Sequence, residues 1–443
     1  MNVLMYTLGC KLNQCESEAI ADAFKHEGFS VVTDYELADL CVVNTCTVTS
    51  KAEQKARRMI RKYASGKAQP VVLVTGCYAQ MEAQALEQLD PRVVVVSLDD
   101  KPALLNLPKY LVERHLAGFA LLDAVRSFVD EPSPSSSSFS YDAATFSFHS
   151  RAFLKIQDGC DNACAYCRVT IARGDARSLD ADEVIRRSVA LEDQGFTELV
   201  LTGVNISAYQ SNSLGLGGLL LLLLDELGPH MRIRLSSLEP DTIDEQLIQA
   251  ISDPRVQPHF HIPVQSASEL VLNRVNRLYP MQQVRTVIER LRQVKSDPFI
   301  AADIITGLPA ETDEAFGETV RFIKEMDLSQ LHVFPFSPRP QTALYTASDR
   351  VPESLRDVRA KELRELSAIQ FHRYMSRQVG TVVEMIVEQK SDGTCSGLTG
   401  NYLKIAVSDV PESVQRGSLI RIALNYDKQS GHLSGRYVSV IHH

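Results

Sequence analysis

The sequence predicts an α/β protein built from a parallel α/β domain, a partial β/α barrel and a small antiparallel β-barrel. Apolar strand-like segments alternate with helical ones along most of the chain, and a Pro/Ser-rich segment interrupts the alternation once. Short β segments dominate the C-terminal end. With 443 residues, 44% of them hydrophobic and 23% charged, the composition is that of a globular protein of about three domains.

The first domain is expected over residues 1–130. Its strand-like segments are continuous apolar runs, each followed by a helical stretch, which is typical of a parallel sheet covered on both faces. The expected strands are 3–7, 40–44, 71–75 and 92–97, and the expected helices are 16–26, 50–64 and 81–89. Residues 131–145 are expected to be a linker, because their Pro/Ser run cannot bury a core.

A longer β/α series is expected over residues 146–376. Six strand-like segments alternate with helical stretches such as 182–194 and 281–295, which indicates a full or partial barrel. The expected strands are 153–157, 199–202, 233–237, 260–264, 300–305 and 332–336, and an amphipathic helix over about 352–377 leads out of the barrel. Over residues 377–443 short β segments alternate with turn residues, which predicts the small antiparallel barrel.

Cysteine count and charge restrict the function. Nine cysteines are an odd number in a chain too long to need disulfides, so they indicate a reducing compartment and metal or redox chemistry. The N-terminus lacks a secretory pattern, and the apolar run Leu219–Leu224 is too short to cross a membrane, so we expect a cytoplasmic protein without a membrane partner. The net charge of -9 disfavours bulk coating of nucleic acid and leaves only local basic patches.

The strongest local motif consists of Cys160, Cys164 and Cys167. Three thiolates within eight residues can each bind one iron of a [4Fe–4S] cluster and leave the fourth iron open for a small molecule. The motif follows the first predicted barrel strand, which puts it on the rim where barrel active sites lie. A zinc knuckle is the alternative, although structural zinc usually has four protein ligands and no fourth Cys or His follows nearby.

A second set of cysteines is dispersed but falls at equivalent points of the fold. Cys10, Cys46 and Cys77 each follow one of the first three predicted strands. Parallel strands end along one edge of a sheet, so these thiols are expected to converge. The alternative is burial as a small side chain, the commonest fate of a free cysteine. That alternative fits Cys41 and Cys395, while Cys15 could be a spare thiol.

Together with the cysteine sets, three further motifs resemble the radical-SAM methylthiotransferase family over nearly the whole chain. They are Thr202–Asn205, His261–Ser266 and Asp303–Thr312. The family has an N-terminal methylthiotransferase domain, a radical-SAM barrel and a C-terminal TRAM β-barrel. The opening Thr7–Gln14 is most similar to the branch that acts on threonylcarbamoyladenosine in tRNA. The isopentenyladenosine branch usually has Gln after the cysteine, and the branch acting on a ribosomal-protein aspartate usually has Pro.

This resemblance implies an enzyme that inserts a methylthio group at C2 of the modified adenosine next to the anticodon. It implies two [4Fe–4S] clusters and S-adenosylmethionine, with Cys160, Cys164 and Cys167 holding the cluster that cleaves S-adenosylmethionine to a 5′-deoxyadenosyl radical. Cys10, Cys46 and Cys77 would hold the cluster that carries the sulfur. The implied cofactor-binding residues are Tyr166, Thr202, Gly203, Asn205, Gln265 and Ser266.

The implied partners are tRNA and a one-electron donor such as flavodoxin or ferredoxin. A basic stretch after Cys46 is a candidate phosphate-binding helix, with a solvated basic helix as the alternative. Lys11 and Asn13 could tune the neighbouring cluster or contact the substrate, with an ordinary surface lysine as the alternative for Lys11. A non-catalytic iron–sulfur protein that binds RNA or carries electrons is the competing function from another class.

Overall fold

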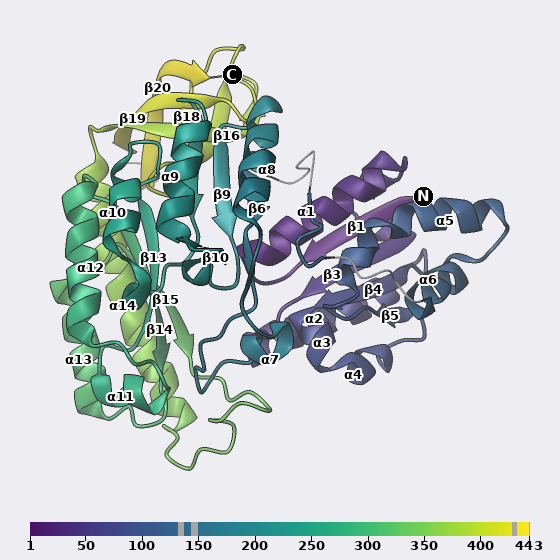
Figure 1. The fold of residues 1–443 in the computed structure, drawn as a ribbon, viewed down its shortest axis with the longest axis horizontal. Coiled ribbons are helices and arrows are strands. Elements are labelled where there is room, and N and C mark those ends of the chain that lie inside the picture. Colours follow the sequence, from purple (N-terminus) through teal and green to yellow (C-terminus); the bar gives the residue numbers. More distant parts are fainter. Residues whose placement is uncertain (132–136, 143–148, 428–431, 443) are drawn as a thin grey trace.

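The computed structural model describes residues 1–131, 137–142, 149–427 and 432–442 (Figure 1). Its first part is a five-stranded parallel sheet in the order β2-β1-β3-β4-β5. The strands are β1 (Asn2–Thr7), β2 (Ser30–Val32), β3 (Leu40–Thr45), β4 (Val71–Gly76) and β5 (Val93–Val95). The helices are α1 (Lys11–His26), α2 (Ser50–Ala64), α3 (Cys77–Met81), α4 (Ala83–Glu87), α5 (Leu107–Leu116) and α6 (Leu121–Asp130).

Alternate strand residues pack against different helices on the two faces of this sheet. Val42 and Leu73 contact the core under α1, α5 and α6, whereas Val43 and Val74 contact the core under α2, α3 and α4. This two-sided burial explains why the strands are continuous apolar runs. The short edge strand β2 was not predicted. The helix predicted over 81–89 corresponds to α4, and a break in helical geometry at Glu82 separates α4 from α3, which was not predicted.

The second part is an open β/α barrel of six main strands, which are parallel within each sheet and connected through helices. This confirms the predicted fold class. The sheets β6-β9-β12 and β13-β14-β15 are each parallel, and an isolated bridge between Ile233 and Val256 lies beside their junction. The strands are β6 (Ala152–Lys155), β9 (Glu198–Thr202), β12 (Arg232–Leu235), β13 (His259–Gln265), β14 (Phe299–Thr306) and β15 (Gln330–Pro335). The outer helices are α8 (Ala181–Asp193), α9 (Leu216–Glu226), α10 (Glu245–Ser252), α11 (Glu269–Arg274), α12 (Met281–Val294), α13 (Asp313–Glu325) and α14 (Glu353–Gln378).

Helix α1 of the first part packs against β6, so the first sheet lies beside the edge of the barrel (Figure 1). The predicted linker 131–145 connects the two parts, and residues 132–136 and 143–145 of it lie outside the described residues. The domain boundaries remain predictions.

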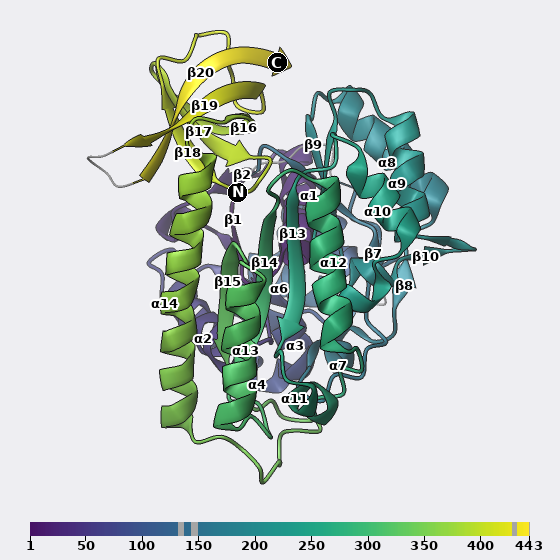
Figure 2. The ribbon, with the colours of Figure 1, turned by 90° about the vertical axis from the view of Figure 1, so that its left-hand side faces the viewer.

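The third part is a closed five-stranded barrel in the order β16-β17-β18-β20-β19. It sits over the ends at which the larger barrel's strands begin, where Phe299 joins its core (Figure 2). Its strands are β16 (Val382–Ser391), β17 (Thr394–Thr399), β18 (Lys404–Ser408), β19 (Leu419–Asp427) and β20 (His432–His442). The predicted antiparallel pairing is wrong for one pair: β18 and β20 are parallel, because the chain crosses through β19 before closing the barrel.

Candidate active site

The first cysteine set lies on one loop between the short strand β7 (Gln157–Asp158) and helix α7 (Val169–Arg173). The loop begins at Gly159, which has a φ of 69°. A Cβ at this position would lie 1.9 Å from the carbonyl oxygen of Asp175, so only glycine permits the turn. The loop carries Cys160, Cys164 and Cys167, all of them partly exposed.

The three sulfurs of this loop share one electrostatic environment. Burial raises the pKa of Cys167 to about 11, and the nearby thiols of Cys164 and Cys160 raise it as well. Arg277 places its Nη1 atom 3.6 Å from the Cys164 sulfur and also pairs with Glu239. Thiolates at this loop therefore need positive charge nearby. Bound iron would supply it, and the Arg277 guanidinium adds positive charge from the protein.

The second cysteine set converges at the carboxyl edge of the first sheet. Cys10 is the N-cap of α1, Cys46 directly follows β3, and Cys77 opens α3 after β4. Burial raises the pKa of Cys46 to about 12, and Cys10 and Cys77 are close enough to raise it further. Strands β1, β3 and β4 are neighbours in the sheet, so the strand-end argument does bring these three thiols together.

Two glycines allow this convergence. Gly9 has a φ of 102°, and a Cβ there would lie 2.8 Å from Cβ of Cys46. Gly76 has a φ of 98°, and a Cβ there would lie 2.4 Å from the carbonyl oxygen of Thr45. A three-thiol donor set in a cradle that excludes any larger residue fits an iron–sulfur cluster, as does the three-thiol loop at Cys160.

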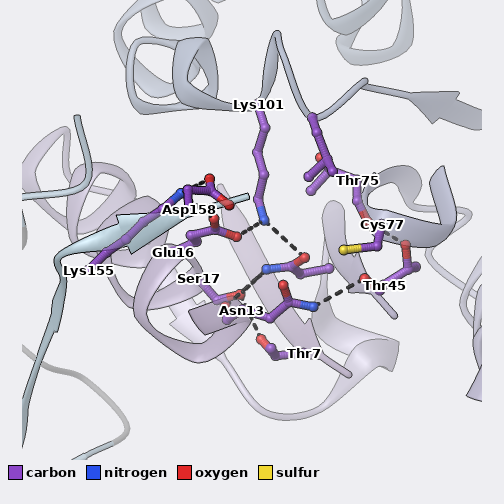
Figure 3. Close-up of polar contacts among 12 residues, drawn as sticks. Thr7, Asn13, Glu16, Ser17, Thr45, Thr75, Cys77, Lys101, Lys155 and Asp158 are labelled. Atoms are coloured by element: carbon purple, nitrogen blue, oxygen red, sulfur yellow. Dashed lines mark hydrogen bonds and ion pairs between the residues drawn. The ribbon is translucent and has the colours of Figure 1, made fainter. Parts of the chain in front are cut away.

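Beneath the second set lies a buried network of charged side chains (Figure 3). Glu16 of α1 accepts hydrogen bonds from Lys101, from Lys155 Nζ at 2.9 Å and from Arg173 Nη1 at 3.2 Å. Asp158 accepts from Lys155 and Arg173 at 2.6 and 2.9 Å. Desolvation opposes ionisation of Glu16, but Arg173, Lys101 and Lys155 hold the pKa of its carboxyl well below the usual range. The network joins the first sheet to the barrel.

Arg173 links this network to both cysteine sets. It ends α7, the helix that follows Cys167, and its Nε lies 3.3 Å from the Cys77 sulfur. Its Nη2 donates to the side-chain oxygen of Asn13 at 3.0 Å. Asn13 in turn donates to the carbonyl oxygens of Leu8 and Thr45 at 2.8 and 3.1 Å. Asn13 therefore positions the loops of the second set and is itself buried.

Three of the predicted cofactor-binding residues lie together beside Cys160. Asn205 places Nδ2 3.9 Å from the Cys160 sulfur, and its backbone N–H donates to Gln157 Oε1 at 2.8 Å. Gly203 approaches Gln157 so closely that a Cβ would lie 2.8 Å from its carbonyl oxygen. The buried Oγ1 of Thr202 and Oδ1 of Asn205 have no hydrogen-bond partner among the described residues. Unsatisfied buried oxygens are rare and fit a site that a polar ligand completes.

The other three make different contacts. Tyr166 packs against the apolar group that includes Val271 and Leu308. Gln265 ends β13 with a φ of 65°, a strained value for a residue other than glycine. The Ser266 hydroxyl lies 3.4 Å from Thr319 Oγ1 and accepts from the Ser268 backbone at 3.3 Å, so it serves the local packing of α13. Their cofactor contacts stay predictions.

A cavity of about 730 Å³ opens between the three parts of the chain. Small-molecule sites occupy about 300–1,000 Å³, so the cavity has the size of a binding site. Its wall combines Cys10 and Lys11 of the first part with residues from the strands of the larger barrel and from the loops after them, and with residues of the C-terminal barrel. The barrel contributes Thr202, Gly203, Ser237, His261, Asp303 and His332, and the C-terminal barrel contributes Glu388, Tyr402 and Lys404.

Lys11 is a cavity residue, so the surface-lysine alternative is wrong. Its Nζ lies 5.3 Å above the ring of Tyr402, which belongs to the C-terminal barrel. Burial, Arg234 and Arg151 lower the pKa of Lys11 to about 7. The polypeptide therefore brings residues more than 390 positions apart in the sequence to one point of the cavity wall.

The basic stretch after Cys46 forms α2 and the turn beyond it. Its one acidic residue, Glu53, points inward and pairs with Arg168 at 3.0 Å and with Arg339. The exposed basic residues are Lys51, Lys55, Arg58, Arg61, Lys62 and Lys67. The outward face of α2 is thus positive.

The remaining cysteines are buried. Cys41 lies inside β3, Cys395 lies in the core of the C-terminal barrel, and Cys15 donates to the Phe153 carbonyl oxygen at 3.3 Å. Within the described ranges, no group of three or more His, Cys, Asp or Glu side chains is spaced to hold a single metal ion. The same ranges contain no helix long and apolar enough to span a membrane.

Comparison with known proteins decides the family. Residues 2–97 match the family described as "Uncharacterized protein family UPF0004", and residues 154–323 match the radical SAM superfamily. The chain is 38% identical to the threonylcarbamoyladenosine tRNA methylthiotransferase MtaB of Treponema pallidum, over 96% of this chain and 98% of that protein. The chain belongs to the threonylcarbamoyladenosine tRNA methylthiotransferase family. The MtaB protein of Bacillus subtilis is 33% identical over 95% of this chain and 93% of its own length.

Among solved structures, a radical S-adenosylmethionine methyltransferase, TsrM from Kitasatospora setae with cobalamin and a [4Fe–4S] cluster bound, shares the fold. Its TM-score is 0.53 at 13% identity, covering 78% of this chain and 74% of that one. This methylthiotransferase is thus a radical-SAM enzyme that uses S-adenosylmethionine and iron–sulfur clusters.

Several charged residues of the methylthiotransferase site were missed from the sequence. Glu16, Lys101, Arg173, Glu239 and Arg277 lie around the two cysteine sets. Arg173 and Glu239 follow a cysteine motif and a barrel strand, which is a weak positional signal. Lys101 opens the short 3-10 helix Lys101–Leu105, and nothing local marks it, because its partner Glu16 is 85 residues away.

Proposed function

We propose that this chain inserts a methylthio group at C2 of threonylcarbamoyladenosine next to the anticodon of tRNA. The observation that carries the proposal is the arrangement of the cavity: Cys10 of one three-thiol set lines its wall, and so do Thr202 and Gly203, which adjoin the other set through Asn205. A reaction that takes a sulfur group from one cofactor and a radical from another requires both at one substrate.

Each part of the chain has a role in this proposal. Cys160, Cys164 and Cys167 hold the cluster that, when bound, supplies reductive cleavage of S-adenosylmethionine. The unsatisfied oxygens of Thr202 and Asn205 would form hydrogen bonds with S-adenosylmethionine. Tyr166, Gly203, Gln265 and Ser266 complete the contacts or the shape of that pocket. Cys10, Cys46 and Cys77 hold the second cluster, and Arg173 neutralises the charge of its thiolates.

Incubation of the reduced, reconstituted enzyme with three acceptors tests the acceptor class. Anticodon stem-loop RNAs carrying threonylcarbamoyladenosine or isopentenyladenosine, and a ribosomal protein, serve as the acceptors. We expect methylthio product on the first RNA, measured by mass spectrometry of digested nucleosides. Product on the protein alone, or no 5′-deoxyadenosine with any acceptor, contradicts the proposal. Flavodoxin or ferredoxin is the proposed one-electron donor, and replacing dithionite by each of them tests it.

Iron analysis checks the cofactor content. Two three-thiol sites that each hold one cubane give about eight irons and eight sulfides per chain, whereas one occupied site gives about four. We expect the higher value after anaerobic reconstitution, and a Cys46→Ala variant serves as the control with about four. A wild-type value near four contradicts the second cluster.

The outward face of α2 is the proposed contact for tRNA phosphates. Lys51, Lys55 and Arg58 are exposed and lie on one face of the helix at spacings of about one turn. We expect replacement of all three by Gln to weaken tRNA binding and to reduce the slope of log Kd against log salt by about one for each phosphate that is no longer bound. Filter binding between low and moderate salt measures both.

Lys361→Gln is the matched control, because Lys361 is exposed on α14, where it pairs with Glu365. An unchanged salt slope in the triple variant would show that α2 is only a solvated basic helix.

A further inference from the structure

The cavity wall near Lys11 holds more positive than negative charge. Arg234 is neutralised by Glu198 through two contacts of 2.6 and 3.0 Å. Arg151 lies 3.2 Å from Glu388 and 3.6 Å from the same Glu198. The two arginines thus take up both carboxylates, and neither Glu198 nor Glu388 lies within ion-pair distance of Lys11.

Lys11, by contrast, has no carboxylate partner among the described residues. Within the described ranges its ammonium group makes no hydrogen bond and no ion pair within 4.0 Å, and it lies over the face of Tyr402 at 5.3 Å. Unlike the buried Arg234, Lys11 is partly accessible from the cavity. An anion bound there would supply the missing charge.

The scaffold around Lys11 is fixed by groups from two parts of the chain. Tyr402 has a φ of 67°, unusual for an aromatic residue, and its ring stacks on His259 with centroids 4.0 Å apart. Arg234 lies 5.2 Å from the centre of the same ring and donates to the Gly400 carbonyl oxygen at 2.9 Å. The C-terminal barrel therefore holds one wall of the anion position in place.

The substrate of the proposed function carries an anion at a suitable point. In a threonylcarbamoyl group, N6 of adenine is bonded to a carbonyl carbon that is bonded in turn to the threonine nitrogen, so the threonine carboxylate remains free and charged. N6 is attached to C6 of the same rigid ring that contains C2, and Lys11 directly follows Cys10 in the chain. Anchoring the carboxylate at Lys11 would therefore orient C2 near the second cysteine set. An isopentenyl group at N6 is uncharged and could not form an ion pair with Lys11.

We propose that Lys11 binds the carboxylate of the threonylcarbamoyl group and thereby selects this modified adenosine. The inference rests on the proposed function and names the residue that reads its substrate. Lys11 is thus a specificity residue. A charge-assisted contact between its ammonium group and the carboxylate, in a partly desolvated site, is worth about tenfold in affinity.

Binding of stem-loop RNA to the non-reduced holoenzyme tests this without turnover. The two probes carry threonylcarbamoyladenosine either as the free acid or as its methyl ester. We expect the wild type to bind the acid about tenfold more tightly than the ester. Lys11→Met should lose this preference and bind the ester as the wild type does, and Lys11→Arg should retain it. Lys361→Met, on the outer surface of α14, should behave as the wild type.

Each other outcome overturns the inference. If Lys11→Met keeps the acid preference, another residue reads the carboxylate. If Lys11→Met binds both probes more weakly than the wild type by the same factor, Lys11 contacts a backbone phosphate. If the wild type binds both probes equally, no carboxylate site exists, a result that needs no variant. Iron content and the cluster spectrum of each variant show that the fold is intact. Methylthio product on the acid probe with the reduced wild type tests the proposed function separately.

Discussion

We expect Cys160→Ala to abolish reductive cleavage of S-adenosylmethionine. The loop at this site offers three thiols, and a cubane bound by only two of them leaves two irons without protein ligands. Formation of 5′-deoxyadenosine, measured with dithionite as the reductant, should fall below detection. The methylthio product should be lost with it.

Cys46→Ala should divide the two activities that Cys160→Ala removes together. Its thiol belongs to the second cysteine set and not to the Cys160 loop. Cleavage of S-adenosylmethionine should therefore continue, while methylthio product is no longer formed. Cys395→Ala is the matched control, because this thiol lies in the core of the C-terminal barrel. Methylthio product from the Cys46→Ala enzyme would contradict the role of the second set.

Convergence of the dispersed cysteines could be predicted because it depends only on strand order. Cys10, Cys46 and Cys77 follow strands that are adjacent in a parallel sheet, and a parallel sheet ends along one edge. The prediction needed no side-chain contact between distant segments. The fold class followed in the same way from the alternation of strands and helices. The parallel pairing of β18 with β20 in the C-terminal barrel could not be predicted, because no local sequence pattern indicates it.

The environment of Lys11 could not be predicted from its neighbours in the sequence. A lysine beside a strand-end cysteine most often faces solvent, and here it faces Tyr402 only because a separate β-barrel covers that side of the cavity. Arg173 is a similar case, since Glu16 is 157 residues away and nothing local marks the pair. Residues that act across domain contacts are therefore invisible to motif and periodicity arguments.

The largest effect on stability is expected at Glu16. This buried carboxylate accepts from Lys101, Lys155 and Arg173, and Asp158 shares the last two of these cations. Glu16→Gln keeps the volume but leaves buried positive charge uncompensated. Breaking a buried ion pair from one side costs about 3–5 kcal/mol, so we expect a loss of that size in the apparent free energy of unfolding.

Anaerobic urea unfolding of the holoenzyme measures this loss. Glu183→Gln is the matched control, because Glu183 also binds two arginines, Arg186 and Arg187, but lies at the surface of α8. Exposed ion pairs contribute about 0–1 kcal/mol, so the control should shift the unfolding midpoint little. Equal shifts in the two variants would show that the network under Cys77 does not hold the first sheet to the barrel. A large shift at Glu16 alone would show that the domain contact and the support of the second cysteine set depend on the same carboxylate.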